Sequence, residues 1–232
     1  MTAASTVDTD VVVRALGSVV DPELDRPITE LGFVARCEVR GDGVEVDLRL
    51  PTYFCAPNFA YLMVADAHGA LSSLPGVGRV SVRLLDHFAA EEINAGVAAG
   101  EGFDAAFPGL AAGELDELRA VFLRKAHAAE QERLAGILLK SGRTHEDLTA
   151  LTLADLPDTT ALRRLRRRLG LRDDDRAPLL TDDAGDPLTQ DDLPLRLRIA
   201  RTTRISIEAN QTWCQGLLDT RYPHPQPPTH PH

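Results

Sequence analysis

Residues 48–59 read LRLPTYFCAPNF, and this stretch marks the place where a strand gives way to a helix. Upstream of it, apolar and charged residues alternate over positions 44–50, which is the period-two pattern of a strand with one buried face. Pro51 lacks the backbone N–H that a sheet requires, so the strand should stop there. Pro57 suits the first turn of a helix, and apolar residues follow helical spacing over 59–74.

Cys55 lies in the loop between this strand and this helix. Thr52 precedes it in the loop, and Pro57 and Asn58 begin the helix. The free N–H groups and the positive dipole end of a helix N-terminus favour a thiolate, which is the form of cysteine that binds metals and attacks electrophiles. The alternative is that Cys55 is a small buried residue that only packs. The position of Cys55 leaves both interpretations open.

The segments around this junction extend the pattern. Apolar spacing predicts a first helix over 8–20, which Asp21-Pro22-Glu23 should end because a residue before proline is pushed out of the helical region. Alternation predicts a strand over 33–40, with Cys37 on its core face.

A hairpin turn at 41–43 joins this strand to the next, and a third strand is predicted over 79–85. The order helix, strand, strand, helix, strand predicts a small domain whose helices cover one face of a three-stranded sheet.

The second half of the chain changes to helical spacing. Long helices are predicted over 114–140 and from Thr189 to about Leu218, although the alternation over 193–199 leaves a strand possible there. We place Cys214 in a helical core. The predicted fold class is therefore α+β, with a small α-β-β-α-β domain followed by a mainly α-helical domain.

The predicted domain boundaries follow from composition. We expect a flexible N-terminus over 1–7, the α/β domain over 8–95 and a Gly/Ala-rich linker over 96–113. A helical docking domain should occupy 114–221, and a Pro/His-rich disordered tail 222–232.

Composition and charge exclude several classes of protein. The chain has 232 residues, of which 44% are hydrophobic, so a real core is expected, but no apolar run is long enough to cross a bilayer. Residues 1–10 lack the pattern of a signal peptide, and three distant cysteines favour a reducing compartment, so we predict a cytoplasmic protein without a membrane partner. Residues 1–113 carry a net charge of −9 out of −10 for the whole chain, which argues against nucleic-acid binding.

Residues 8–88, approximately, resemble the FeS assembly P family, which includes SufT-like and PaaD-like proteins. The resemblance is carried by a loop with one cysteine before a helix, by the preceding hairpin, and by the segments Asp21-Pro22-Glu23-Leu24, Leu31-Gly32-Phe33-Val34 and Leu74-Pro75-Gly76-Val77. The usual loop of the family reads Thr-x-Pro-Gly-Cys-Pro. This chain keeps the cysteine, and the following proline is displaced by one position to Pro57.

The resemblance implies a role in iron–sulfur cluster assembly or in the maturation of metal-dependent enzymes, not an enzyme activity. A stable cluster usually needs four protein ligands, mostly cysteine thiolates. This chain has three scattered cysteines and no Cys-x-x-Cys. We therefore expect Cys55 to bind iron or an iron–sulfur cluster transiently, in a homodimer or together with a partner. The implied partners are a client metalloenzyme, such as an oxygenase, and other assembly factors.

Two further residues are candidate metal ligands beside Cys55. Asp21 offers carboxylate oxygens, although a turn at the end of the first helix is the alternative role for it. His87 follows the third strand, where a surface or capping role is the alternative. Pro22, Glu23 and Gly32 are interpreted as structural.

Two other functions remain open. The chain could be a non-catalytic accessory protein of a multicomponent di-iron oxygenase, in which case Cys55 would not matter. It could also be a thiol-dependent enzyme with Cys55 as the nucleophile. No base with an orienting partner is evident for that reaction.

Overall fold

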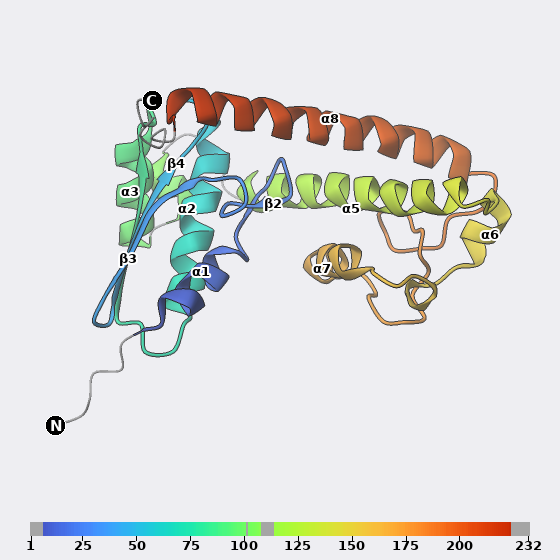
Figure 1. Cartoon of the computed structure of the whole chain (residues 1–232), viewed down its shortest axis with the longest axis horizontal. Coiled ribbons are helices and arrows are strands. Elements are labelled where there is room, and N and C mark those ends of the chain that lie inside the picture. Colours follow the sequence, from blue (N-terminus) through green and yellow to red (C-terminus); the bar gives the residue numbers. More distant parts are fainter. Residues whose placement is uncertain (1–6, 101, 108–113, 224–232) are drawn as a thin grey trace, which may run out of the picture. The chain divides into compact units, whose positions relative to one another are not determined.

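The computed structural model describes residues 7–100, 102–107 and 114–223. The chain divides into two compact units, and Figure 1 labels many of their helices and strands. The first unit contains the described residues up to Leu115 together with those from Asn210 onward, and the second contains residues 116–209. The first unit is therefore built from two separate parts of the sequence.

The first unit is built on a three-stranded sheet with the order β3-β4-β5. β3 (Val34–Arg40) pairs antiparallel with β4 (Gly43–Arg49), and β4 pairs parallel with β5 (Arg79–Leu85). Parallel neighbours need a crossover connection, and α2 (Pro57–Ser72) provides it. The carboxyl ends of β4 and β5 consequently lie at the same edge of the sheet.

Helices and strands of this unit share one hydrophobic core. α2 packs on β5 and also contacts α1 (Thr9–Leu16) and α3 (Ala90–Ala99). The buried core includes Leu16, Phe33, Val46, Leu48, Val64, Leu71, Leu84 and Ile93. Asp47 is held by Arg36 at 2.7 Å and by Arg83 at 2.9 Å, so charged residues of all three strands form one network. The predicted α+β class is confirmed.

The first helix is shorter than the predicted range 8–20. It ends at Leu16, and residues Val20–Asp21 form β1, which pairs antiparallel with β2 (Arg26–Pro27). The Ile28 N–H donates to the Val19 carbonyl at 2.9 Å, so the chain folds back on itself where a helix was expected to continue. Asp21-Pro22-Glu23 therefore forms the turn of this small hairpin and does not end the helix.

Part of the range predicted as a linker is helical. α3 runs to Ala99, and α4 occupies Phe103–Ala106. A Cβ added to Gly96 would lie only 2.5 Å from the Cβ of Ala106, so the small side chains let these two helices approach closely. Residues 108–113 lie outside the described residues, as do residues 1–6 of the predicted N-terminus and 224–232 of the predicted tail.

The second unit is helical. It contains most of α5 (Glu114–Lys140), then α6 (His145–Ala150), the 3-10 turn η1 (Leu153–Asp155), α7 (Thr160–Leu169) and most of α8 (Leu193–Arg221). Its core is formed mainly by leucines: Leu134, Leu148, Leu153, Leu162, Leu179, Leu180 and Leu193. Residues 193–199 are helical, so the alternative of a strand there is wrong. No described helix is long and apolar enough to span a membrane.

Candidate functional site

The candidate site lies at the edge where β4 and β5 end. In α/β sheets, the loops that follow the carboxyl ends of parallel strands commonly form the binding site. Here the loop after β4 carries Cys55, and the loop after β5 carries His87. Ala56 is the N-cap residue of α2 and gives no side-chain cap, and Pro57 occupies the first turn. Cys55 thus lies directly before a helix N-terminus, as the sequence predicted.

Thr52 contacts the thiol of Cys55. Its Oγ1 lies 3.3 Å from the Cys55 Sγ and accepts a hydrogen bond from the Phe54 N–H at 3.2 Å. A hydroxyl oxygen can accept two hydrogen bonds and donate one, so either Thr52 or the Cys55 thiol can be the donor in this contact. The third predicted loop residue, Asn58, accepts from the Phe59 N–H at 2.9 Å, which is a local contact within the helix start.

His87 contacts the backbone of Cys55. The His87 Nε2 lies 2.7 Å from the Cys55 carbonyl oxygen, and the Ala89 N–H donates to the His87 Nδ1 at 3.2 Å. This pair of contacts requires a neutral ring with its proton on Nε2. Burial lowers the pKa of His87, and the nearby Arg221 lowers it further, against the opposing effect of the Cys55 carbonyl. Both ring nitrogens are therefore engaged in holding the loop in place.

Asp21 forms the turn between β1 and β2. Its Oδ1 accepts from the Glu23 N–H at 2.9 Å and from the Leu24 N–H at 2.8 Å. Burial raises the pKa of Asp21 to about 6, while the two backbone donors act in the opposite direction. Gly32, in the other quoted motif, has a positive φ of 74°, which explains the need for glycine there.

The C-terminal part of α8 also lies at this edge, a position that no local pattern in the sequence predicts. The Arg221 Nη1 donates to the Leu50 carbonyl at 3.1 Å, and the same guanidinium donates to the Asp86 carbonyl. Cys214, about two turns closer to the start of α8, is half-buried against the core of the first unit. Burial raises the pKa of Cys214 to about 11, and Asp21, Cys55 and Glu23 each add to that effect through their negative charge.

Exposed aromatic rings surround the loop. Phe54 is 77% exposed, and Tyr53 and Phe88 are each 47% exposed. The Phe54 ring lies 5.0 Å from the Tyr53 ring and 6.1 Å from the Phe88 ring, measured between centroids. The Phe88 N–H donates to the Tyr53 carbonyl at 3.2 Å, so this contact ties the loop after β5 to the loop after β4. Large exposed aromatic side chains are typical of surfaces that bind other proteins.

The described residues contain no group of three or more His, Cys, Asp and Glu side chains that could hold a metal ion. The predicted ligands Cys55, Asp21 and His87 therefore do not form a complete site. The Cys55 thiol can supply one ligand, whereas His87 uses both ring nitrogens within the protein.

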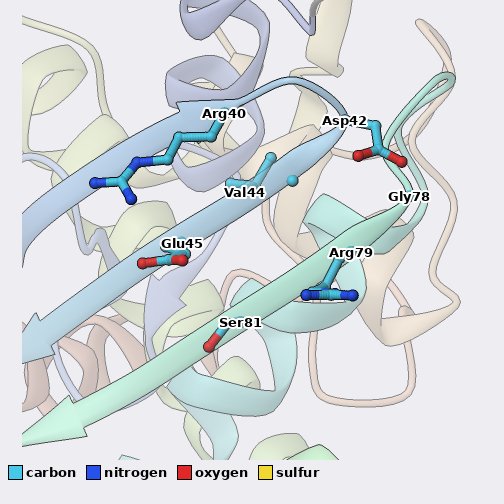
Figure 2. A pocket seen from close by; sticks show the side chains of 8 residues that line it. Arg40, Asp42, Val44, Glu45, Gly78, Arg79 and Ser81 are labelled. Atoms are coloured by element: carbon cyan, nitrogen blue, oxygen red, sulfur yellow. The ribbon is translucent and has the colours of Figure 1, made fainter.

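A hollow of about 550 Å³ lies where β4 and β5 begin, at the end of these strands opposite Cys55. Figure 2 shows Arg40, Arg79, Asp42 and Glu45 around it, a mixture of both charges. The Gly78 N–H donates to the Asp42 carbonyl at 2.9 Å, and a Cβ on Gly78 would meet the Asp42 side chain at 2.1 Å. The residues that line this hollow include no cysteine.

Comparisons with known proteins agree with the resemblance. Residues 9–82 match the family described as iron–sulfur cluster assembly protein. The chain is also 37% identical over 73 residues to an iron–sulfur cluster carrier protein of Deinococcus radiodurans, covering 32% of this chain and 20% of that relative. The chain thus matches about a fifth of the length of this curated relative. The predicted resemblance is confirmed for residues 9–82, and the second half of the chain has no part in the family match.

Proposed function

We propose that this protein is an assembly or carrier factor that binds iron or an iron–sulfur cluster transiently at Cys55 and passes it to a client metalloenzyme. The main support is the position of Cys55. Its thiol contacts the Thr52 hydroxyl and lies directly before the uncapped N-terminus of α2, in the part of the chain that matches the assembly family. Thiolates are the preferred protein ligands of iron–sulfur clusters.

We assign positioning roles to the residues around Cys55. His87 fixes the loop through the Cys55 carbonyl, and we propose this role in place of the ligand role predicted from the sequence. Asp21 fixes the turn between β1 and β2 through two backbone N–H groups. The Thr52 hydroxyl contacts the sulfur at 3.3 Å and positions the thiol.

An incomplete ligand set suits a carrier better than a resident metal site. A cargo held by few ligands of the carrier can exchange to a client that supplies the rest. We propose that the client completes the coordination when it docks on the aromatic rings of Tyr53, Phe54 and Phe88. The helical range 114–221 is then proposed to select the client, which is the docking role predicted for it.

The test is client maturation in cells that express a client metalloenzyme together with this protein. Cys55→Ala should leave the fold intact and lower the iron or cluster content of the purified client, because loop residues contribute little to the core. Phe54→Ala should lower client maturation while leaving metal binding by the isolated protein unchanged, since this ring is 77% exposed. Cys37→Ala serves as the control, because Cys37 packs against the core.

The outcomes separate the candidate functions. Normal client maturation by Cys55→Ala would support the accessory protein of a multicomponent oxygenase and contradict the carrier. Cys55-dependent turnover of a small electrophile by the purified protein would instead support a thiol enzyme. The described residues around Cys55 offer no base for that reaction other than His87, whose ring contacts the Cys55 carbonyl and not the thiol.

A further inference from the structure

Another hollow of the first unit lies between the start of β3 and the C-terminal end of α8. Its volume is about 510 Å³, which is within the range of sites that bind small molecules. Val34 lines this α8 hollow from β3 and Arg49 lines it from the end of β4, while most of the wall comes from residues 215–223. All of these residues belong to the first unit, but 215–223 lie outside the family match over 9–82.

Two arginines of the α8 hollow share one aromatic ring. The Arg49 Cζ lies 4.7 Å from the centroid of the Tyr222 ring, and the Arg221 Cζ lies 5.1 Å from the same centroid. The Tyr222 hydroxyl donates to the Asp86 Oδ2 at 3.0 Å, which fixes the orientation of the ring. Two positive charges held near one ring repel each other, and an anion that contacts both relieves this repulsion.

The charges of these two arginines are only partly compensated by their neighbours. Arg221 donates to the carbonyls of Leu50 and Asp86, which are neutral groups. The Arg49 Nε lies 3.5 Å from the Asp86 Oδ2, and no described group accepts a hydrogen bond from this buried nitrogen. The Arg49 side chain is 40% exposed and lines the hollow, so the rest of its guanidinium is accessible to a bound molecule.

The remaining wall indicates which class of anion fits. Leu218 and Val34 offer apolar surface to the body of a ligand. Asp219 also lines the hollow, and its Oδ1 accepts from the Gln215 Nε2 at 3.1 Å. The negative charge of Asp219 disfavours a phosphate group, which carries nearly two charges at neutral pH. A carboxylate carries one charge, and its planar shape matches the two parallel N–H groups of a guanidinium.

We propose that the α8 hollow binds a small carboxylate with an apolar body, and that its carboxylate group lies between Arg49 and Arg221. This site is separate from the Cys55 thiol and does not depend on the function proposed for it. Arg221 also holds the carbonyls of Leu50 and Asp86, so the bound carboxylate lies beside the two loops of the candidate site.

Benzoate and benzamide test the site in the full chain. The two molecules have nearly the same shape, but only benzoate carries a negative charge. Nuclear magnetic resonance follows the Nε–H signals of the arginines while either molecule is added to the native protein. Benzoate should shift the signals of Arg49 and Arg221 until they saturate, whereas benzamide should not. The signal of Arg79, which lines the mixed-charge hollow at the other end of β5, should stay in place.

Three variants test the roles of the charges. Arg49→Gln should bind benzoate about tenfold more weakly or worse, because a charge-assisted hydrogen bond is lost. Arg79→Gln is the matched control and should bind like the native chain. Asp219→Asn keeps an oxygen for Gln215 and removes a repelling charge, so it should bind benzoate about twofold to fivefold more tightly. Circular dichroism confirms that each variant is folded.

Several results would overturn the proposal. Equal binding of benzamide would show that charge does not matter, and shifts of all arginine signals without saturation would show that benzoate acts only as a salt. Displacement of benzoate by an equal concentration of inorganic phosphate would contradict the carboxylate class. Cys55→Ser should bind benzoate like the native chain. A loss of binding in that variant would place benzoate at the thiol and not in the α8 hollow.

Discussion

The three cysteines of this chain occupy three different settings. Cys37 lies in β3 and packs against the core, and burial raises its pKa. Cys214 lies on the inward face of α8 among negative charges. Cys55 alone lies in a loop before a helix N-terminus with a hydroxyl at 3.3 Å from its sulfur. The same functional group is therefore placed in settings that differ in burial, charge and hydrogen bonding.

The alkylation rates of the three cysteines should differ because their burial, charge and hydrogen bonding differ. We expect iodoacetamide to label Cys55 first in the native protein. The pKa of Cys214 rises from 9.0 to about 11, so its thiolate fraction near neutral pH should be about 100-fold below that of an ordinary thiol. Peptide mapping after timed labelling measures the three rates. Equal rates, or faster labelling of Cys37, would contradict the assignment, and a urea-unfolded sample provides the reference.

A buried histidine of the second unit predicts how stability depends on pH. His127 is 1% exposed, and the Arg166 Nε donates to its Nε2 at 3.3 Å. Burial lowers the pKa of His127 from 6.5 to about 4, and the charge of Arg166 acts in the same direction. The unfolded chain therefore binds a proton more readily than the folded chain between these two pH values.

The stabilising contribution of neutral His127 is complete above pH 6.5 and is lost as the pH falls through about 4. The loss should reach about 3 kcal/mol in the free energy of unfolding. Hydrogen exchange of the α5 amides at a series of pH values measures it within this unit. His127→Gln should remove most of the pH dependence, whereas His145→Gln, at a half-exposed position of α6, should not. Identical profiles for both variants would contradict the assignment.

At the level of single residues, the sequence predicts position better than role. Cys55 is placed correctly because the change from period two to helical spacing, with Pro51 and Pro57, is a local signal. The role of His87 depends on a carbonyl that is 32 positions away in the sequence. The position of Cys214 against the core of the first unit depends on the packing of α8, and no local pattern in the sequence predicts that packing.

Among the secondary-structure elements, the C-terminal end of α8 packs against Gly32, and this packing depends on the absence of a side chain there. Gly32 has a φ of 74°, and an added Cβ would lie 3.3 Å from the Leu218 Cδ2. Gly32→Ala should therefore lower the free energy of unfolding by about 1–3 kcal/mol through backbone strain. Gly69→Ala is the matched control, because Gly69 lies in α2 and its Cβ would meet nothing within 4 Å. That variant should be more stable by up to about 1 kcal/mol.

Urea unfolding of both variants gives the two values. A Gly32→Ala protein as stable as the native chain would show that neither the positive φ nor the contact with Leu218 constrains this turn. Faster alkylation of Cys214 in Gly32→Ala is the accompanying expectation, because a displaced Leu218 would loosen the same face of α8.

One strand pairing of the sheet can be predicted from local sequence patterns, and the other cannot. The hairpin β3–β4 follows from the turn at 41–43 and from the alternation on either side. The parallel pairing of β4 with β5 requires α2 to cross the sheet, and strand patterns by themselves do not report strand direction. This pairing brings the loops of Cys55 and His87 to one edge of the sheet. Local sequence patterns therefore could not predict that the two loops lie together.

For the whole molecule, the two units do not correspond to two halves of the sequence. The residues from Asn210 onward belong to the first unit, although helical spacing from residue 114 onward predicted one continuous helical domain. Leu218 is buried in the core of the first unit, and Cys214 and Tyr222 pack against it. The first unit is thus completed by a segment that follows the whole second unit in the sequence.

Shortened chains test whether the first unit needs the C-terminal end of α8. A chain that stops after Ala209 loses the buried Leu218 and the Arg221 contacts with Leu50 and Asp86. Loss of one large buried side chain alone lowers the free energy of unfolding by about 2–5 kcal/mol. The melting temperature of the first unit should therefore fall, and the Cys37 thiol should become accessible to alkylating reagents. A chain that stops after Pro223 keeps every described contact and should melt like the full chain. If the chain ending at Ala209 protects Cys37 as well as the full chain does, the end of α8 only rests on a unit that is already complete.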